Sequence, residues 1–389
     1  GCGMNLYEIG SGEYNDELLA LAAGKHSIDG VETGSDEWKA AVEDLKRKLG
    51  SLTPVSYKLA GLISPYFAQK YGFDRETRIF PFTGDNLATI LALPLAQNDV
   101  LISLGTSTTA LLVTKNYSPS QQYHLFKHPT LKDHYMGMIC YCNGSLAREK
   151  IRDALGGEEW KKFDEILDSS KSFDDKLGIY FPLGEIVPNA AAQTKRLQWK
   201  DGKLEDVKKW DVEEDVSSIV ELQTLSCRLR LGPMLANDGG DSEKHLDSDE
   251  NDNKEFTQIY KELVDEFGEI STDGKEQTKE SLLARPHKMF YVGGALKNIS
   301  IVKKMSQIFG LEDGNYTAEV PNACALGGAY KASWGFLCES SGKPQDFDKY
   351  INNGFDFSTL DSIEVESKWK EYFRGIGMLA QMEKELKKE

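Results

Sequence analysis

The chain has 389 residues, with 46 Lys and Arg against 62 Asp and Glu, and its formal net charge of −16 argues against a nucleic-acid-binding surface. Hydrophobic residues make up 40% of the sequence, which suits a globular protein of roughly two to three domains. Because no uncharged apolar run reaches about 18 residues and no leader pattern is visible, we expect no membrane partner and a cytoplasmic location.

Apolar residues recur at helical spacing from Glu13 to Ala23, from Asp36 to Leu49 and from Leu59 to Tyr71, which predicts three helices. The segment Arg78 to Phe82 then favours a short strand. Asp85 follows it as a predicted N-cap, and Leu87 to Leu93 supply the apolar face of a helix that ends at Pro94.

Val100 to Thr114 predicts a β-hairpin, because apolar and β-branched residues flank the small-residue turn Gly105-Thr106-Ser107-Thr108. A strand from Tyr135 to Cys142 leads through Asn143-Gly144 into a helix from Ser145 to Ala154, and a further helix is expected from Trp160 to Leu167. The six cysteines form no Cys-x-x-Cys pair, so we expect reduced thiols and no metal site, with Cys140 and Cys142 as small buried residues.

The stretch from 236 to about 256 is acidic and poor in large apolar residues, which predicts a mobile surface insertion. It interrupts a domain, because helical spacing returns from Ile259 to Phe267. Further along, we expect a strand at Lys288–Val292, a Gly293-Gly294-Ala295 turn and a helix at Ser300–Phe309.

The last predicted elements are a strand from Tyr316 to Val320 and a helix from Ala323 to Phe336. That helix is rich in small residues, and Gly327, Gly328 and Ala329 would let it pack closely on a neighbour. Strands that alternate with helices indicate an α/β architecture.

Neither a P-loop nor a strand-linked G-x-G-x-x-G motif is present. Two glycine turns remain, Gly105-Thr106 between strands and Gly293-Gly294 between a strand and a helix. Without side chains, such turns let backbone N–H groups approach a phosphate or a purine ring closely. Either turn taken alone is better explained as ordinary tight-turn chemistry, because glycine is the usual residue there.

Asp85 lies between a strand end and a helix start, where ligands of open α/β sheets bind. A carboxylate in this place can accept the proton of a substrate hydroxyl as the hydroxyl attacks a phosphoryl group. The alternative is a purely structural N-cap.

Taken together, these segments resemble the FGGY carbohydrate kinases and, within them, the fungal D-xylulose kinases. The resemblance extends over nearly the whole chain outside the acidic stretch. The matching motifs are Thr83-Gly84-Asp85-Asn86-Leu87-Ala88, Ser103-Leu104-Gly105-Thr106-Ser107-Thr108-Thr109, Tyr123-His124-Leu125-Phe126, the segment from Met136 to Arg148, Tyr180-Phe181-Pro182-Leu183-Gly184-Glu185-Ile186-Val187-Pro188, Val292-Gly293-Gly294-Ala295 with Lys297-Asn298, and Cys324-Ala325-Leu326-Gly327-Gly328.

The resemblance implies an actin-like ATPase (ribonuclease H-like) fold with two domains, and ATP-dependent phosphorylation of D-xylulose to D-xylulose 5-phosphate with Mg²⁺. It implies that Asp85 is the catalytic base and that Asn86 helps to bind the sugar. The ATP-binding residues that it implies are Gly105, Thr106, Trp160, Gly293, Gly294, Lys297 and Asn298. Packing in a helical core is the other interpretation of Trp160.

The family's amino-terminal strand-turn-strand, with its first phosphate contacts and sugar ligands, has no counterpart in this sequence. We therefore expect residues 1–97 to be the carboxyl-terminal remainder of a truncated first domain and 98–389 to be the complete second domain. On this interpretation the chain alone is inactive and poorly soluble, and a complete site needs the missing segment. Leu296, where the family carries a small serine, is a further departure.

Two alternatives remain open. One is another sugar of the same family, such as ribulose or glycerol. The other is a catalytically silent actin-like protein that binds nucleotide, for which an isolated nucleotide domain would suffice.

Overall fold

The computed structural model describes residues 2–52, 55–157, 159–208, 210–236, 250–272, 274–311 and 313–386. These residues form two compact units. Unit 1 comprises residues 1–94, 126–134 and 322–355, and unit 2 comprises residues 95–125, 135–321 and 356–389.

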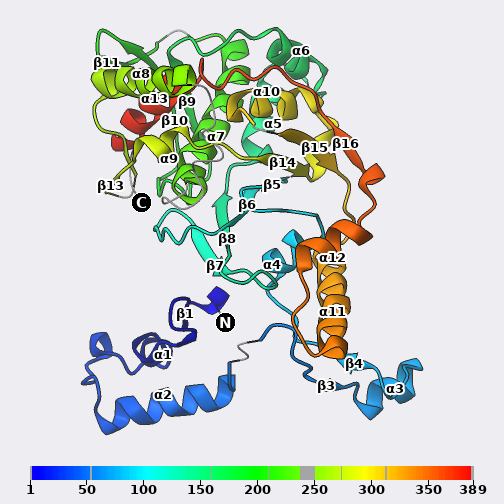
Figure 1. The fold of residues 1–389 in the computed structure, drawn as a ribbon. Helices are drawn as coiled ribbons and strands as arrows, with labels where there is room; N and C mark the ends of the chain where they lie inside the picture. The colour runs from blue at the N-terminus through cyan, green and yellow to red at the C-terminus, as the bar shows by residue number, and fades with distance from the viewer. Residues whose placement is uncertain are drawn as a thin grey trace. The chain divides into compact units, whose positions relative to one another are not determined.

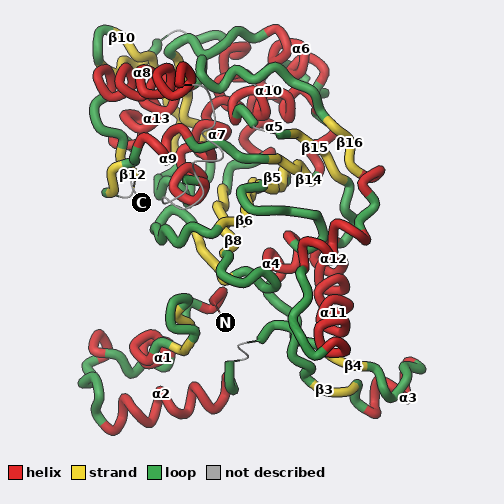
Figure 2. The backbone as a smooth tube through the Cα atoms, in the orientation of Figure 1, coloured by secondary structure: helices red, strands yellow, loops and turns green. Residues whose placement is uncertain are grey.

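Unit 1 consists mainly of helices and loops with a few very short strands (Figure 2). Its elements are η1 (Cys2–Met4), β1 (Tyr7–Glu8), β2 (Glu13–Tyr14), α1 (Asp16–Ala22), η2 (Ser27–Asp29), α2 (Asp36–Leu49), β3 (Gly61–Leu62), α3 (Pro65–Tyr71), β4 (Arg78–Ile79), α4 (Asp85–Ile90), α11 (Ala323–Ser341) and α12 (Phe347–Gly354).

The sequence places α2 correctly but misplaces two other helix starts. Helix α1 begins at Asp16, because the Asn15 side chain caps it by accepting the Leu18 N–H. Helix α3 begins only at Pro65, a residue that suits the first turn of a helix, and β3 precedes it. The predicted helix from Leu59 is therefore wrong over its first six residues.

Helices α4 and α11 pack with their backbones in contact, as the small residues of α11 predicted. A Cβ atom added to Gly327 would lie 1.8 Å from the carbonyl oxygen of Ala88. At Gly328 an added Cβ would lie 2.3 Å from the Phe82 ring. Only glycine permits this approach at Gly327, because the neighbouring atoms belong to the backbone and cannot rotate away.

Unit 2 is built around a seven-stranded mixed sheet of order β16-β15-β14-β5-β6-β8-β7 (Figure 1). Strand β14 runs parallel to β15 and β5, whereas β6 runs antiparallel to both of its neighbours, β5 and β8. The strands of this sheet are β5 (Val100–Leu104), β6 (Thr108–Thr114), β7 (His124–Lys127), β8 (Tyr135–Tyr141), β14 (Lys288–Val292), β15 (Gly314–Ala318) and β16 (Leu360–Ser362).

Smaller sheets and a set of helices complete unit 2. Its smaller sheets contain β9 (Lys176–Phe181), β10 (Gln193–Lys200), β11 (Lys203–Asp206), β12 (Ser271–Thr272) and β13 (Lys275–Glu276). Its helices are α5 (Ser145–Ala154), α6 (Lys161–Ser169), α7 (Val212–Leu235), α8 (Glu250–Phe267), α9 (Lys279–Leu283), η4 (Gly294–Lys297), α10 (Ile299–Phe309), η5 (Phe357–Thr359) and α13 (Phe373–Lys384).

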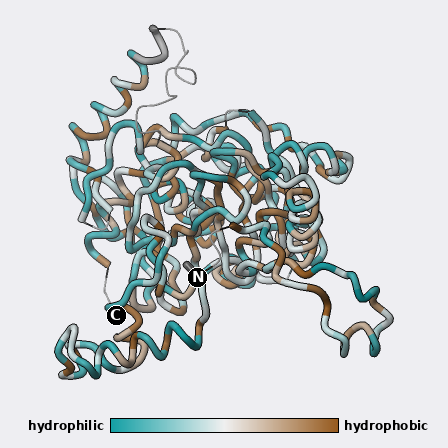
Figure 3. Tube along the Cα trace, turned by 60° about the horizontal axis from the view of Figure 1, so that its bottom comes forward, coloured by the Kyte–Doolittle hydropathy of each residue, from teal (hydrophilic) through white to brown (hydrophobic). Residues whose placement is uncertain are grey.

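The core of unit 2 lies around α7, which contacts β9 of the three-stranded sheet β11-β10-β9 and β6 and β8 of the seven-stranded sheet (Figure 1). Hydrophobic stretches run through the interior in Figure 3, and the buried side chains of these two sheets and of α7 form one cluster. Burial of apolar surface on this scale is the main stabilising contribution to such a unit. None of the described helices is long and apolar enough to cross a membrane.

The strand and helix predictions for unit 2 are largely confirmed. The hairpin β5–β6, helix α5 and strand β14 lie where the sequence placed them. Cys140 and Cys142 are half-buried, so their predicted full burial is wrong. Most of the predicted acidic insertion lies outside the described residues, and α8 starts at Glu250.

Candidate functional site

The two glycine turns of the sequence are neighbours in the structure. Strands β5 and β14 are parallel and adjacent, with Val292 paired to Ser103, so both end at the same edge of the sheet. Gly293 has φ +105°, and a Cβ atom added to it would lie 2.7 Å from the carbonyl oxygen of Leu104. A side chain at Gly293 would therefore collide with the end of β5, just before Gly105.

A third turn, which sequence reasoning missed as part of the site, completes this edge. The turn Cys142–Gly144 connects β8 to α5. The Gly144 N–H donates to the Thr106 carbonyl at 3.0 Å, and the Ser145 N–H donates to the Gly105 carbonyl at 3.0 Å. A Cβ atom on Gly144 would lie 2.6–2.8 Å from the backbone of residues 105–107. The available sequence signal was Asn143-Gly144 between a strand and a helix.

The Gly293 turn leads directly into a helix start. Gly293 and Gly294 are exposed, and nothing lies within 4 Å of a Cβ atom added to Gly294. Lys297 is exposed at the end of η4, and Asn298 is buried at the N-cap of α10. Accessible glycine backbone lets a flat purine ring approach closely, while the cationic side chain and the partial positive charge of the helix N-terminus favour a ligand that also carries phosphates.

Trp160 is placed differently from the glycine turns. It precedes α6, its ring makes an edge contact with Phe163 at 5.3 Å, and the Arg152 guanidinium lies 4.8 Å from its centre. At the other end of α6, Asp168 accepts a hydrogen bond from Ser300 near the start of α10. Trp160 is half-buried, so the structure gives it a packing role on this helix.

Asp85 and Asn86 begin α4 in unit 1. The N-cap is Gly84, so the predicted capping role of Asp85 is wrong, and its carboxylate is exposed on the first helical residue. Asp85 Oδ1 accepts the Asn86 N–H at 2.8 Å and the Asn86 side-chain amide at 3.3 Å. An oriented and solvent-accessible carboxylate of this kind can accept a proton from a bound hydroxyl group.

Comparison with known proteins identifies a group of relatives. No protein-family model matches the chain. It is 45% identical over 401 residues to xylulose kinase of Saccharomyces cerevisiae, and this match covers 99% of this chain and 62% of that protein. It is 37% identical over 352 residues to D-xylulose kinase A of Aspergillus niger, covering 86% of this chain and 52% of that protein. The chain thus spans between half and two thirds of the length of these relatives.

Solved structures with the same fold are also sugar kinases. Xylulose kinase from Bifidobacterium adolescentis matches with a TM-score of 0.64 and 19% identity, over 95% of this chain and 60% of that one. Plasmodium falciparum glycerol kinase with ADP matches with a TM-score of 0.58 and 10% identity, over 95% and 59%. The predicted fold is thereby confirmed as that of the actin-like sugar kinases.

Proposed function

We propose that this chain, a partial-length homologue of the fungal xylulose kinases, carries the catalytic base and the nucleotide site of a kinase that transfers phosphate from ATP to D-xylulose. The observation that carries the proposal is the meeting of the two glycine turns at one sheet edge, in a chain 45% identical to such a kinase. The product is D-xylulose 5-phosphate.

In the proposed reaction Asp85 accepts the proton of the sugar's 5-hydroxyl group. The hydroxyl oxygen forms a bond to the γ-phosphorus while the bond from that phosphorus to the β-phosphate oxygen breaks, so that ADP leaves. Asn86 fixes one carboxylate oxygen through two hydrogen bonds, which orients the other oxygen for the proton. We assign sugar binding to Asp85 and Asn86 together.

We assign the nucleotide to the glycine edge of unit 2. The backbone of Gly105 and Thr106 contacts the phosphates, and Gly293, Gly294, Lys297 and Asn298 contact the adenosine part. Trp160 remains an ATP-binding proposal that rests on family resemblance. Mg²⁺ would enter with ATP and screen its phosphate oxygens, because this ion usually binds through phosphates, waters and one or two carboxylates.

The relatives are longer than the segment that this chain matches, and we propose that the rest of the sugar site comes from their unmatched part. Residues 1–97 would then belong to the sugar-binding domain and residues 98–389 to the ATP-binding domain. The chain by itself would be inactive, and the protein would act in the cytoplasm on small molecules.

A coupled assay of ADP release tests the proposal. Full-length protein is supplied with ATP, Mg²⁺ and either D-xylulose, D-ribulose or glycerol, with the Saccharomyces cerevisiae enzyme as positive control. We expect ADP release that depends on D-xylulose and exceeds that with the other two acceptors. Preference for another acceptor would change the substrate, and nucleotide binding with no acceptor-dependent turnover would indicate a silent binding protein.

A further inference from the structure

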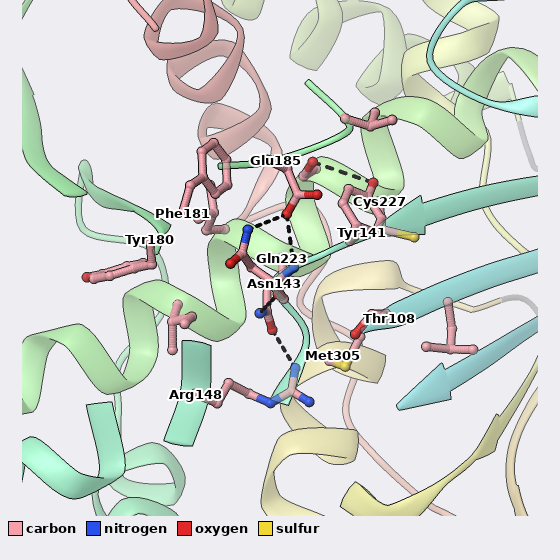
Figure 4. Close-up of a pocket in the computed structure, with 15 residues that line it drawn as sticks. Thr108, Tyr141, Asn143, Arg148, Tyr180, Phe181, Glu185, Gln223, Cys227 and Met305 are labelled. Carbon is pink, nitrogen blue, oxygen red and sulfur yellow. Dashed lines mark hydrogen bonds between the residues drawn. The ribbon is translucent and has the colours of Figure 1, made fainter. Parts of the chain in front are cut away.

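A buried carboxylate holds one side of the Cys142–Gly144 turn. Glu185 is 6% exposed, and its Oε1 accepts the Cys142 N–H at 2.7 Å. Its Oε2 accepts the Asn143 N–H at 3.2 Å and the Asn143 side-chain amide at 2.9 Å (Figure 4). Oε1 also accepts the Ile186 N–H at 2.8 Å, so the two oxygens of Glu185 together accept these four hydrogen bonds.

A glutamine holds the other side of the turn. Gln223 Nε2 donates to the Asn143 carbonyl at 2.7 Å and to the Gly144 carbonyl at 3.2 Å. Its Oε1 accepts from Arg148 Nη1 at 2.5 Å, and Arg148 Nη2 reaches the Ser145 hydroxyl at 3.1 Å. Burial lowers the pKa of Arg148 to about 10, so the guanidinium stays charged at neutral pH. Because a guanidinium can only donate, the side-chain oxygen of Gln223 faces it and the side-chain N–H₂ group faces the turn.

A cavity of about 20 Å³ is lined in part by Asn143, Arg148, Glu185 and Gln223, and it has room for about one water molecule and none for a nucleotide. The network is therefore not itself a nucleotide site. The network acts on the Gly105–Thr106 loop through the Cys142–Gly144 turn, because the Gly144 N–H donates to the Thr106 carbonyl and the neighbouring Ser145 N–H donates to the Gly105 carbonyl. A buried charged network costs desolvation free energy, and such networks are useful where they specify one local arrangement.

We propose that Glu185 is a positioning residue for nucleotide binding. By fixing the Cys142–Gly144 turn it holds the Gly105–Thr106 loop in the arrangement that receives the phosphates. The inference rests on the proposed function, since it assigns a role toward the same nucleotide.

The test compares Glu185→Gln with Glu383→Gln in the full-length protein. Glutamine keeps the shape of Glu185 but turns an N–H₂ group toward backbone donors. Glu383 pairs with the buried Arg230 at 2.9 Å, and its side chain is 12% exposed, so its variant also removes a largely buried carboxylate but leaves the turn untouched. Calorimetry gives the Kd for ADP, thermal unfolding gives stability, and steady-state kinetics give separate KM values for ATP and sugar.

We expect Glu185→Gln to raise the Kd for ADP and the KM for ATP at least about tenfold and to leave the KM for sugar unchanged, since hydrogen bonds to charged groups are among the stronger ones. Glu383→Gln should keep the ADP affinity while lowering the melting temperature. Gln223→Glu retains an acceptor for Arg148 but places an oxygen against the Asn143 and Gly144 carbonyls, so it should also weaken ADP binding. This variant provides the test if Glu185→Gln does not fold.

Two results would overturn the inference while leaving the proposed function intact. One is wild-type ADP affinity in Glu185→Gln or in Gln223→Glu. The other is an equal loss of affinity in Glu383→Gln, which would show a general effect of destabilisation. Absence of ADP binding by the wild-type protein would instead overturn the proposed function and, with it, this inference.

Discussion

Replacement of Gly327 by alanine is a direct test of how α4, and with it Asp85, is held. The added Cβ atom would lie 1.8 Å from the Ala88 carbonyl oxygen and 3.1 Å from the Ala92 nitrogen. A carbon-to-oxygen contact is comfortable at roughly 3.3 Å, so α4 and α11 must separate by about 1.5 Å. Both obstructing atoms are backbone, which excludes relief by a side-chain rotation.

Overpacking of this kind costs about 1–3 kcal/mol. In a chain of this size that corresponds to a fall in melting temperature of about 1–4 °C. Because α4 begins at Asp85, displacement of the helix also misplaces the proposed base, and a misplacement of about 1 Å can cost about 100-fold in rate. We therefore expect lower stability together with a kcat/KM for D-xylulose reduced about 100-fold.

Thermal unfolding and the ADP-release assay on the full-length protein measure both effects. Gly354→Ala is the matched control, because Gly354 ends α12 in the same unit and nothing lies within 4 Å of an added Cβ atom. If Gly327→Ala melts and turns over like Gly354→Ala, close backbone packing does not position α4 and the reasoning is wrong.

At the nucleotide edge, Gly293→Ala should cost about 1–3 kcal/mol of stability because of the positive φ and the Leu104 contact, whereas Gly294→Ala has open space and should leave the melting temperature unchanged in the same unfolding experiment. Burial lowers the pKa of His128 to about 3, while an unfolded histidine titrates near pH 6.5. The stability that His128 contributes as a neutral buried group is therefore complete only well above pH 6.5, and about 2 kcal/mol of it is lost between neutral pH and pH 5. In the wild-type protein the imidazole Nδ1 of His128 accepts the Leu131 N–H at 3.0 Å, and His128→Asn keeps an acceptor for it. Urea unfolding at pH 7 and pH 5 should show that this variant lacks the loss of stability that His128 causes at pH 5. Equal pH dependence of stability in both proteins would contradict the assignment.

The parts of the fold that the sequence predicted well are those set by local patterns. The β5–β6 hairpin has a clear turn between apolar strands, and the small residues of α11 indicated that this helix packs closely on a neighbour, which the structure shows to be α4. The helix predicted from Leu59 fails because apolar spacing alone does not exclude the strand β3 or locate the start at Pro65. The N-cap of α4 was displaced by one residue because Gly84 already has the extended cap conformation.

The site was only partly predictable for a different reason. Both glycine turns were visible, but their meeting depends on the pairing of β5 with β14, which no local pattern reveals. The network of Glu185, Gln223 and Arg148 joins three distant segments, and nothing around Glu185 in the sequence signals that its carboxylate is buried. Burial of a carboxylate follows from tertiary packing and is not readable from residue spacing.

The most direct measurement is the steady-state rate of D-xylulose-dependent ADP release by full-length protein with Asp85 and with Asp85→Asn, alongside calorimetric binding of ADP to both. Asparagine keeps the shape of the side chain and cannot take the proton, so we expect turnover to fall by about 10²–10⁴-fold while ADP affinity is unchanged. Undiminished turnover in Asp85→Asn would contradict the account of this chain as the carrier of the catalytic base.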